Sequence, residues 1–213
     1  MTANEQGAAG APAERLAYPR VVDGPYPESE HPLETAWTFW VERRGNDRKQ
    51  QGDYLKGLQQ IGTFRTVEEF HRLCAFLRPP SNFPRDYNLL CFRTGAMPMW
   101  EEFPDGGSWN HRLRRSSESG TIADTLWVAL LHACVGEAFE TPNVVGCVLS
   151  SRLKEIVLSV WNASDKNDQQ VRLRIGDTMR KVLDAGPNTV LEYKENASAI
   201  KAFSYSKEST QVS

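Results

Sequence analysis

The chain has 213 residues, 40% of them hydrophobic, which is enough for one well-filled core and excludes two full domains. Its formal net charge of −2 excludes binding of nucleic acid through a general basic field, so such contact requires a local patch. Apolar runs as long as a membrane span and a signal-peptide pattern are both missing, so we expect a cytoplasmic or nuclear protein without a membrane partner.

The cysteines favour a reducing compartment. Four are present, widely spaced and without a C-x-x-C pair beside a histidine cluster, so we expect neither structural zinc nor another metal or cofactor. Cys74 and Cys134 fall within apolar helical patterns, which is typical of buried free thiols.

The two ends of the chain differ from its middle. Residues 1–30 are dominated by Ala, Gly, Pro and Glu and bury too little apolar surface to offset the entropy of ordering, so we predict a disordered tail. A single domain is expected over residues 31–200. Residues 201–213, rich in Ser, Lys and Thr, are predicted to form a flexible C-terminal tail.

Three segments have the apolar period of helices. The first begins with the capping-box pattern of Thr66 and Glu69 and stops before Pro79 and Pro80. The second is predicted over residues 123–139, and the third over residues 168–183.

Strand-like runs lie between these helices. They cover residues 36–42, 87–93, 109–113, 144–150, 156–162 and 189–193. Several strands between successive helices, with hairpin-like connections, indicate an α+β fold in which helices back one face of an antiparallel sheet. The other face of the sheet is then open to a ligand.

The run 156–162 shows which side chains would lie on the open face. Ile156, Leu158 and Val160 share one side of a strand, and Val157, Ser159 and Trp161 share the other. If the aliphatic side meets the helices, Trp161 points toward the open face.

Several short motifs follow one another in a specific order. They are His31-Pro32-Leu33, Trp37-Thr38-Phe39-Trp40, Ile61-Gly62-Thr63-Phe64, Pro98-Met99-Trp100-Glu101, Gly106-Gly107-Ser108-Trp109, Trp127 with Gly136-Glu137, and Arg152 followed by Trp161. In this order and spacing the chain resembles the translation initiation factor 4E family of mRNA cap-binding proteins over residues 31–200. It is most similar to the second class, the 4E homologous proteins, because of Trp-Thr-Phe-Trp and of Pro187 to Lys194.

The resemblance implies a curved antiparallel sheet of about eight strands, with three long helices on the convex face and a ligand slot on the concave face. It also implies a ligand, the 7-methylguanosine cap. That base is a flat cation, and each aromatic ring stacked on it contributes roughly 0.5 to 2 kcal/mol of cation–π energy that unmethylated guanine does not gain.

By match to the family, Tyr54 and Trp100 are the two stacking rings, and Glu101 accepts the hydrogens on the guanine edge through a charge-assisted pair. Trp161 contacts the methyl group. Arg152 and Lys154 match the phosphate contacts, whereas Val157 occupies a position where main-class members carry a lysine. Phosphate affinity is then lower unless Lys201 or Lys207 reaches the slot.

The resemblance further implies a helical peptide partner, from a 4G-like scaffold or a 4E-binding protein, laid across the convex helices. The matching residues are His31, Pro32, Leu33, Val67, Trp127 and Glu137. Three positions differ from the family pattern: His71 replaces an exposed Trp, Ala129 an acidic residue and His132 an apolar one. The two histidines are either solvated helix residues without a role or contacts for a distinct, pH-dependent partner.

Three functions remain to be weighed. The leading one is a cap-binding protein that acts in translation initiation or its regulation. The second is a protein-interaction scaffold that keeps the fold, binds cap weakly and represses translation. An enzyme is not expected, since H-E-x-x-H, G-x-S-x-G and phosphate-loop motifs are absent from the sequence. Isolated tryptophans on strands are most often core residues, and we expect this of Trp37, Trp40, Trp109 and Trp127.

Overall fold

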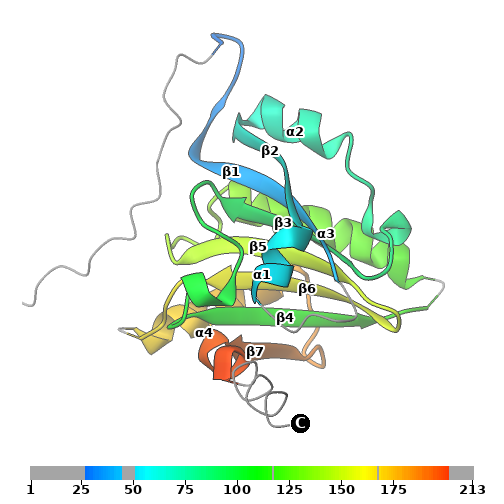
Figure 1. Ribbon diagram of the computed structural model, residues 1–213, viewed down its shortest axis with the longest axis vertical. Helices are drawn as coiled ribbons and strands as arrows, with labels where there is room; N and C mark the ends of the chain where they lie inside the picture. The colour runs from blue at the N-terminus through cyan, green and yellow to red at the C-terminus, as the bar shows by residue number, and fades with distance from the viewer. Residues whose placement is uncertain (1–26, 45–50, 117, 167, 202–213) are drawn as a thin grey trace, which may run out of the picture.

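One antiparallel sheet organises the molecule, and its strands run in the order β2-β1-β3-β5-β6-β4-β7 (Figure 1). The computed structural model describes residues 27–44, 51–116, 118–166 and 168–201. The strands are β1 (Pro32–Arg43), β2 (Leu58–Thr66), β3 (Tyr87–Arg93), β4 (Gly107–Arg114), β5 (Val144–Ser151), β6 (Glu155–Asn162) and β7 (Leu191–Glu195). The predicted α+β class is confirmed, with seven strands in the described residues rather than about eight.

The helices are α1 (Gln51–Gly57), α2 (Val67–Cys74), α3 (Ser119–Val135) and α4 (Gln169–Val182). The helical pattern of the sequence predicted α2, α3 and α4, although α2 has only 8 residues. Thr66 caps α2 by accepting a hydrogen bond from the Glu69 amide, as the capping-box pattern indicated. The predicted end of α3 was too late, because the chain turns at Glu137, where φ is 56°.

The core lies between the sheet and the helices. In Figure 1 α3 runs behind the sheet, and α1 lies in front of it. The main cluster joins alternate residues of the central strands to the apolar faces of α2, α3 and α4; it includes Phe39, Leu89, Leu149, Leu158, Phe70, Leu130 and Ile175. Period two therefore directs every second strand residue into this convex-side core.

The remaining strand residues face the concave side. A second, smaller cluster there includes Leu90, Phe92, Phe103 and Val148, with Trp40 and Trp161 packed against it. The register aligns Trp161 of β6 with Gly146 of β5 and with Ser108 of β4. The predicted alternation within 156–162 is confirmed, since Ile156, Leu158 and Val160 are in the convex-side core.

The Gly-Gly motif is explained by close approach of the backbone. A Cβ on Gly106 would lie 2.1 Å from the Asn162 carbonyl oxygen, and one on Gly107 would lie 2.4 Å from the Lys194 carbonyl oxygen. The segment that enters β4 thus passes between β6 and β7 with no room for a side chain.

Asn196, the residue directly after β7, is hydrogen-bonded to the loop between β3 and β4. Its backbone N–H donates to the carbonyl of Gly106 at 3.0 Å, and its side-chain amide donates to the carbonyl of Phe103 at 2.9 Å. With 3% of its surface exposed, Asn196 is a buried connection between the C-terminal part of the fold and the loop that carries Trp100.

Trp37 and Trp127 are buried in the convex-side core, as expected. Trp109 packs at its edge, where its indole N–H donates to the Arg172 carbonyl at 2.8 Å. The four cysteines are free, and Cys74 is only partly buried. No helix in the described parts of the chain is long and apolar enough to span a membrane.

Outside the described residues lie most of the two predicted tails, 1–26 and 202–213. Glu30, at the end of the predicted N-terminal tail, contacts the fold: its carboxylate pairs with Arg72 at 2.6 Å and accepts from the Thr66 hydroxyl at 2.8 Å.

Candidate functional site

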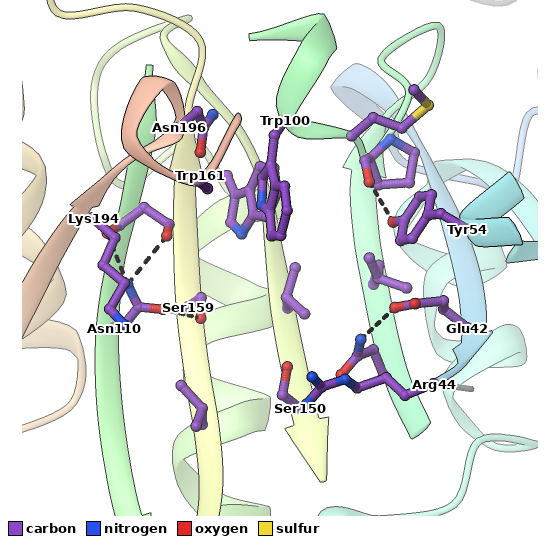
Figure 2. A pocket seen from close by; sticks show the side chains of 18 of the residues that line it. Glu42, Arg44, Tyr54, Trp100, Asn110, Ser150, Ser159, Trp161, Lys194 and Asn196 are labelled. Atoms are coloured by element: carbon purple, nitrogen blue, oxygen red, sulfur yellow. Dashed lines mark hydrogen bonds between the residues drawn. The ribbon is translucent and has the colours of Figure 1, made fainter. Parts of the chain in front are cut away.

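A cavity of about 610 Å³ opens on the concave face of the sheet. Its floor is made by the concave-facing side chains of β3, β5, β6 and β4, and its upper rim by the Pro98–Glu101 loop (Figure 2). Tyr54, on α1, forms the side wall. A cavity of this size with aromatic walls and a few polar groups is typical of a site for a small ligand or a nucleotide.

Four of the predicted base contacts lie together in this cavity. Tyr54, Trp100, Glu101 and Trp161 all line it, although they come from three different elements: α1, the turn Trp100–Glu102 and β6. In Figure 2 the indole of Trp100 hangs into the cavity from above, with Tyr54 on one side and Trp161 toward the other. Trp100 is 41% exposed, which leaves a large apolar surface facing water.

Local structure holds each aromatic residue in place. Trp100 begins a single 3₁₀ turn, Trp100–Glu102, that closes with a bond from the Phe103 N–H to the Trp100 carbonyl at 3.0 Å. The Tyr54 hydroxyl donates to the carbonyl of Pro98 in the same loop. Trp161 packs edge-on against Phe92, with 5.5 Å between the ring centroids.

The floor also contains polar residues that motif reasoning missed. On one side, the Ser159 hydroxyl donates to Asn110 Oδ1 at 2.7 Å, and Asn110 donates to the Ser108 carbonyl at 2.9 Å. On the other, the buried carboxylate of Glu42 accepts from the side-chain amide of Asn88. Alternation along β6 predicts Ser159 on this face, and the same period along β1, β3 and β4 is the signal that points to Glu42, Asn88 and Asn110.

The predicted phosphate contacts are only partly brought together. Arg152 lines the cavity, whereas Lys154 is exposed in the turn between β5 and β6 and does not line it. Val157 lines the floor, so the lysine of the family pattern is replaced by an apolar side chain. Lys201 is exposed and outside the lining, and Lys207 lies outside the described residues.

The convex face contains the residues predicted to bind a partner. His31 Nδ1 lies 2.6 Å from Glu68 Oε1, and the His31 backbone N–H donates to the other carboxylate oxygen at 2.8 Å. These hydrogen bonds lower the pKa of Glu68 to about 2. The segment His31-Pro32-Leu33 is thereby fixed beside the N-terminus of α2, where Val67 is partly exposed.

His71 and His132 form an aromatic cluster with Phe70 between α2 and α3. The His71 and His132 ring centroids are 5.8 Å apart, and each ring contacts Phe70 edge-on. His132 Nδ1 lies 2.9 Å from the Val128 carbonyl oxygen, which accepts a hydrogen bond when this nitrogen is protonated. Both imidazoles are exposed.

Two other predicted partner residues are engaged within the fold. Trp127 is 3% exposed and belongs to the convex-side core. The Glu137 carboxylate forms a two-point ion pair with Arg93, whose guanidinium also donates to the Thr35 hydroxyl and the Val144 carbonyl at 2.7 Å each. This pair joins the end of α3 to β1, β3 and β5.

Among the residues that the structure describes, no group of three or more His, Cys, Asp or Glu side chains is arranged to hold a metal ion.

Fold and cavity together define a ligand-binding protein built on the concave face of one sheet. The pattern of the family described as "Eukaryotic initiation factor 4E" matches residues 32–211. The chain belongs to this family, whose members are translation initiation factors and cap-binding proteins rather than enzymes.

Relatives confirm the assignment. The chain is 34% identical to translation initiation factor 4E1 of Drosophila melanogaster over 168 residues, 78% of this chain and 62% of the fly protein. It is 31% identical to factor 4E-4 of Caenorhabditis elegans over 182 residues, 84% of this chain and 83% of that protein.

Solved structures agree. The complex of C. elegans eIF4E-3 with the 4E-binding protein Mextli superposes with a TM-score of 0.73 at 27% identity, covering 81% of this chain and 97% of that chain. The complex of Ascaris suum eIF4E-3 with an m2,2,7G cap gives a TM-score of 0.70 at 28% identity, covering 78% and 91%.

Proposed function

We propose that this protein binds the 7-methylguanosine cap of mRNA in the concave cavity and acts from the cytoplasm in translation initiation or its regulation. The observation that carries the proposal is the convergence of Tyr54, Trp100, Glu101 and Trp161 on one cavity. The solved complexes of related proteins with cap and with a 4E-binding protein support it.

The physical basis is a stacked cation. A methylated guanine placed between Tyr54 and Trp100 would cover the exposed indole and gain cation–π energy from both rings. Since the charge of the base arises from its methyl group, unmethylated guanine would lose that energy while keeping much of the apolar contact. Selectivity for the methyl group then follows from the rings.

Glu101 is proposed to read the edge of the base. It follows Trp100 directly in the 3₁₀ turn and is exposed to the cavity, so its carboxylate can lie beside a base stacked on the indole. A carboxylate accepting two N–H groups is a charge-assisted pair, which is stronger than a neutral one.

On the convex face we propose a helical peptide partner from a 4G-like scaffold or a 4E-binding protein, contacting His31, Pro32, Leu33 and Val67. His71, in place of a large aromatic anchor, is proposed to shift the choice of partner.

The test is to remove the charge of Glu101 while keeping its shape. Glu101→Gln should weaken binding of 7-methylguanosine triphosphate at least tenfold, because a hydrogen bond to a charged group contributes about 1.5–3 kcal/mol. Binding is measured by quenching of tryptophan fluorescence, with unmethylated GTP as the comparison ligand. Glu102→Gln, which removes the same charge one residue outside the cavity lining, is the matched control.

Equal binding by wild type and Glu101→Gln would contradict the placement of the base. Failure of the wild-type protein to distinguish the methylated from the unmethylated nucleotide would instead favour the interaction scaffold.

A further inference from the structure

The cavity contains more positive charge than the predicted contacts account for. Four cationic side chains line it: Arg44, Arg112, Arg152 and Lys194. Two of them are already neutralised, since Arg112 pairs with Glu155 at 2.6 Å and Lys194 lies 3.6 Å from Glu192. Arg44 and Arg152 have no carboxylate partner within the described ranges.

The sheet directs both arginines to the same end of the cavity. Arg44 comes two residues after Glu42, and Arg152 comes two residues after Ser150, so each continues a row of concave-facing side chains. The backbone N–H of Arg44 donates to the Asp86 carbonyl at 2.7 Å, and that of Arg152 donates to the Glu155 carbonyl at 2.9 Å. Figure 2 shows the Arg44 side chain reaching over the floor toward Ser150.

Arg152 itself has an unused donor. Its Nε atom is buried and has no hydrogen-bond acceptor among the residues that the structure describes. A buried charged donor without an acceptor is costly, and a bound anion is one way in which this cost is relieved.

The row of paired residues across the floor contains a single cation, Arg112, which already pairs with Glu155. In the register Asn88 pairs with Ser150, Ser150 with Val157, and Val157 with Arg112. Val157 stands where the family pattern has a lysine, so an anion at this end would have to be bound from the rim.

We propose that Arg44 and Arg152 form an anion site that binds the phosphate chain of the capped nucleotide, with Arg44, the residue directly after β1, supplying the charge that Val157 lacks. The inference rests on the proposed cap-binding function and names a residue that the motifs did not include. A guanidinium presents paired N–H groups that match phosphate oxygens, so two arginines at the same end of the cavity can bind one phosphate chain together.

The carboxylates near the two arginines either have other partners or lie outside the cavity lining, so they leave the site available to an anion. Glu42, next to it on the floor, is 2% exposed and already bound to Asn88. Asp86, whose carbonyl accepts from the Arg44 N–H and whose N–H donates to the Ser151 carbonyl, does not line the cavity. Glu155 is paired with Arg112.

The experiment compares Arg44→Gln with Arg43→Gln, which removes the same charge from the neighbouring residue outside the lining. Dissociation constants are measured for 7-methylguanosine mono- and triphosphate at two salt concentrations. Arg44→Gln should weaken binding of the triphosphate about 5-fold at low ionic strength and less in high salt. The effect is modest because the Arg44 guanidinium is partly solvated. The monophosphate should change less, and Arg43→Gln should bind like wild type.

Unchanged triphosphate binding by Arg44→Gln, in a wild-type protein that selects the methylated base, overturns this inference and leaves the proposed function standing. An equal loss in Arg43→Gln, or an equal loss for both nucleotides, also overturns it. A wild-type protein that does not select the methylated base overturns both proposals. Arg44→Lys should retain part of the phosphate effect, because it keeps the charge without the paired donors.

Discussion

Tyr54 is the residue on which the proposed sandwich depends most. Its ring forms the wall opposite Trp100, and its hydroxyl donates to the Pro98 carbonyl in the loop that carries Trp100. One side chain therefore supplies both a stacking surface and a bond that holds the facing loop. Substitutions at this position can separate the two contributions.

We expect Tyr54→Phe, which keeps the ring and loses the hydrogen bond, to weaken binding of the methylated nucleotide by about 1 kcal/mol. Tyr54→Ala should weaken it further and also narrow the difference between methylated and unmethylated guanine nucleotides, because one cation–π partner is gone. Isothermal titration calorimetry with both nucleotides measures the two effects. A difference that stays constant in Tyr54→Ala would show that another residue supplies the second ring.

The predictability of the site varied from residue to residue. Trp100 and Glu101 were found from a local motif, and Trp161 from period-two alternation along its strand. Tyr54 could be assigned only by resemblance, since the polar segment before it has no period. Lys154, assigned to the phosphate contacts by resemblance, is exposed in the turn between β5 and β6 and does not line the cavity, because spacing along the chain does not record where a side chain in a surface turn points.

Among the elements, the long periodic helices were predicted and the strand β2 was missed. Residues 58–66 include two glutamines and a glycine, so they carry neither alternation nor strong strand propensity. The strand forms because β1 offers it a partner, with Trp37 aligned to Phe64 and Thr38 to Thr63. Such pairing is a tertiary effect that one segment's sequence cannot reveal.

The helices α2 and α3 present an aromatic cluster of unusual composition. His71 occupies a position at which the family pattern has an exposed tryptophan, and its ring contacts those of Phe70 and His132. Imidazole is smaller and more polar than indole, so an apolar helical peptide gains less contact area there.

His71→Trp should therefore strengthen binding of a peptide of the Tyr-x-x-x-x-Leu-apolar type by about 1–2 kcal/mol. Fluorescence anisotropy of a labelled peptide measures this gain. Lys181→Trp, on the exposed surface of α4, controls for nonspecific binding caused by any added indole. A gain of equal size in both variants, or in neither, would contradict the assignment of this surface to the peptide.

At the scale of the whole molecule, Arg93 and Glu137 connect elements that are distant in sequence. The Arg93 side chain is 3% exposed and stacks over Trp37 with 4.7 Å from the guanidinium carbon to the ring centroid. Its bonds reach β1, β5 and the residue after α3. The pair lies beneath the convex face, so Glu137 supports that face from below.

Glu137→Gln should lower the free energy of unfolding by about 3 kcal/mol, because it leaves the buried Arg93 charge without its counter-ion. Urea denaturation followed by circular dichroism measures the loss. Glu140→Gln, three residues further along in the same turn and exposed, should change stability little. A loss below about 1 kcal/mol for Glu137→Gln would mean that the ion pair contributes no more than a surface pair does.

Asn196 links two parts of the fold that are distant in sequence, the loop before β4 and the chain after β7. Because its backbone N–H and its side-chain amide donate to Gly106 and Phe103, the turn bearing the Trp100 indole and the chain that leaves β7 are tethered at a common point. Asn196 also lines the cavity, so a displacement of the Trp100 turn and a displacement of the cavity wall after β7 are coupled through one residue.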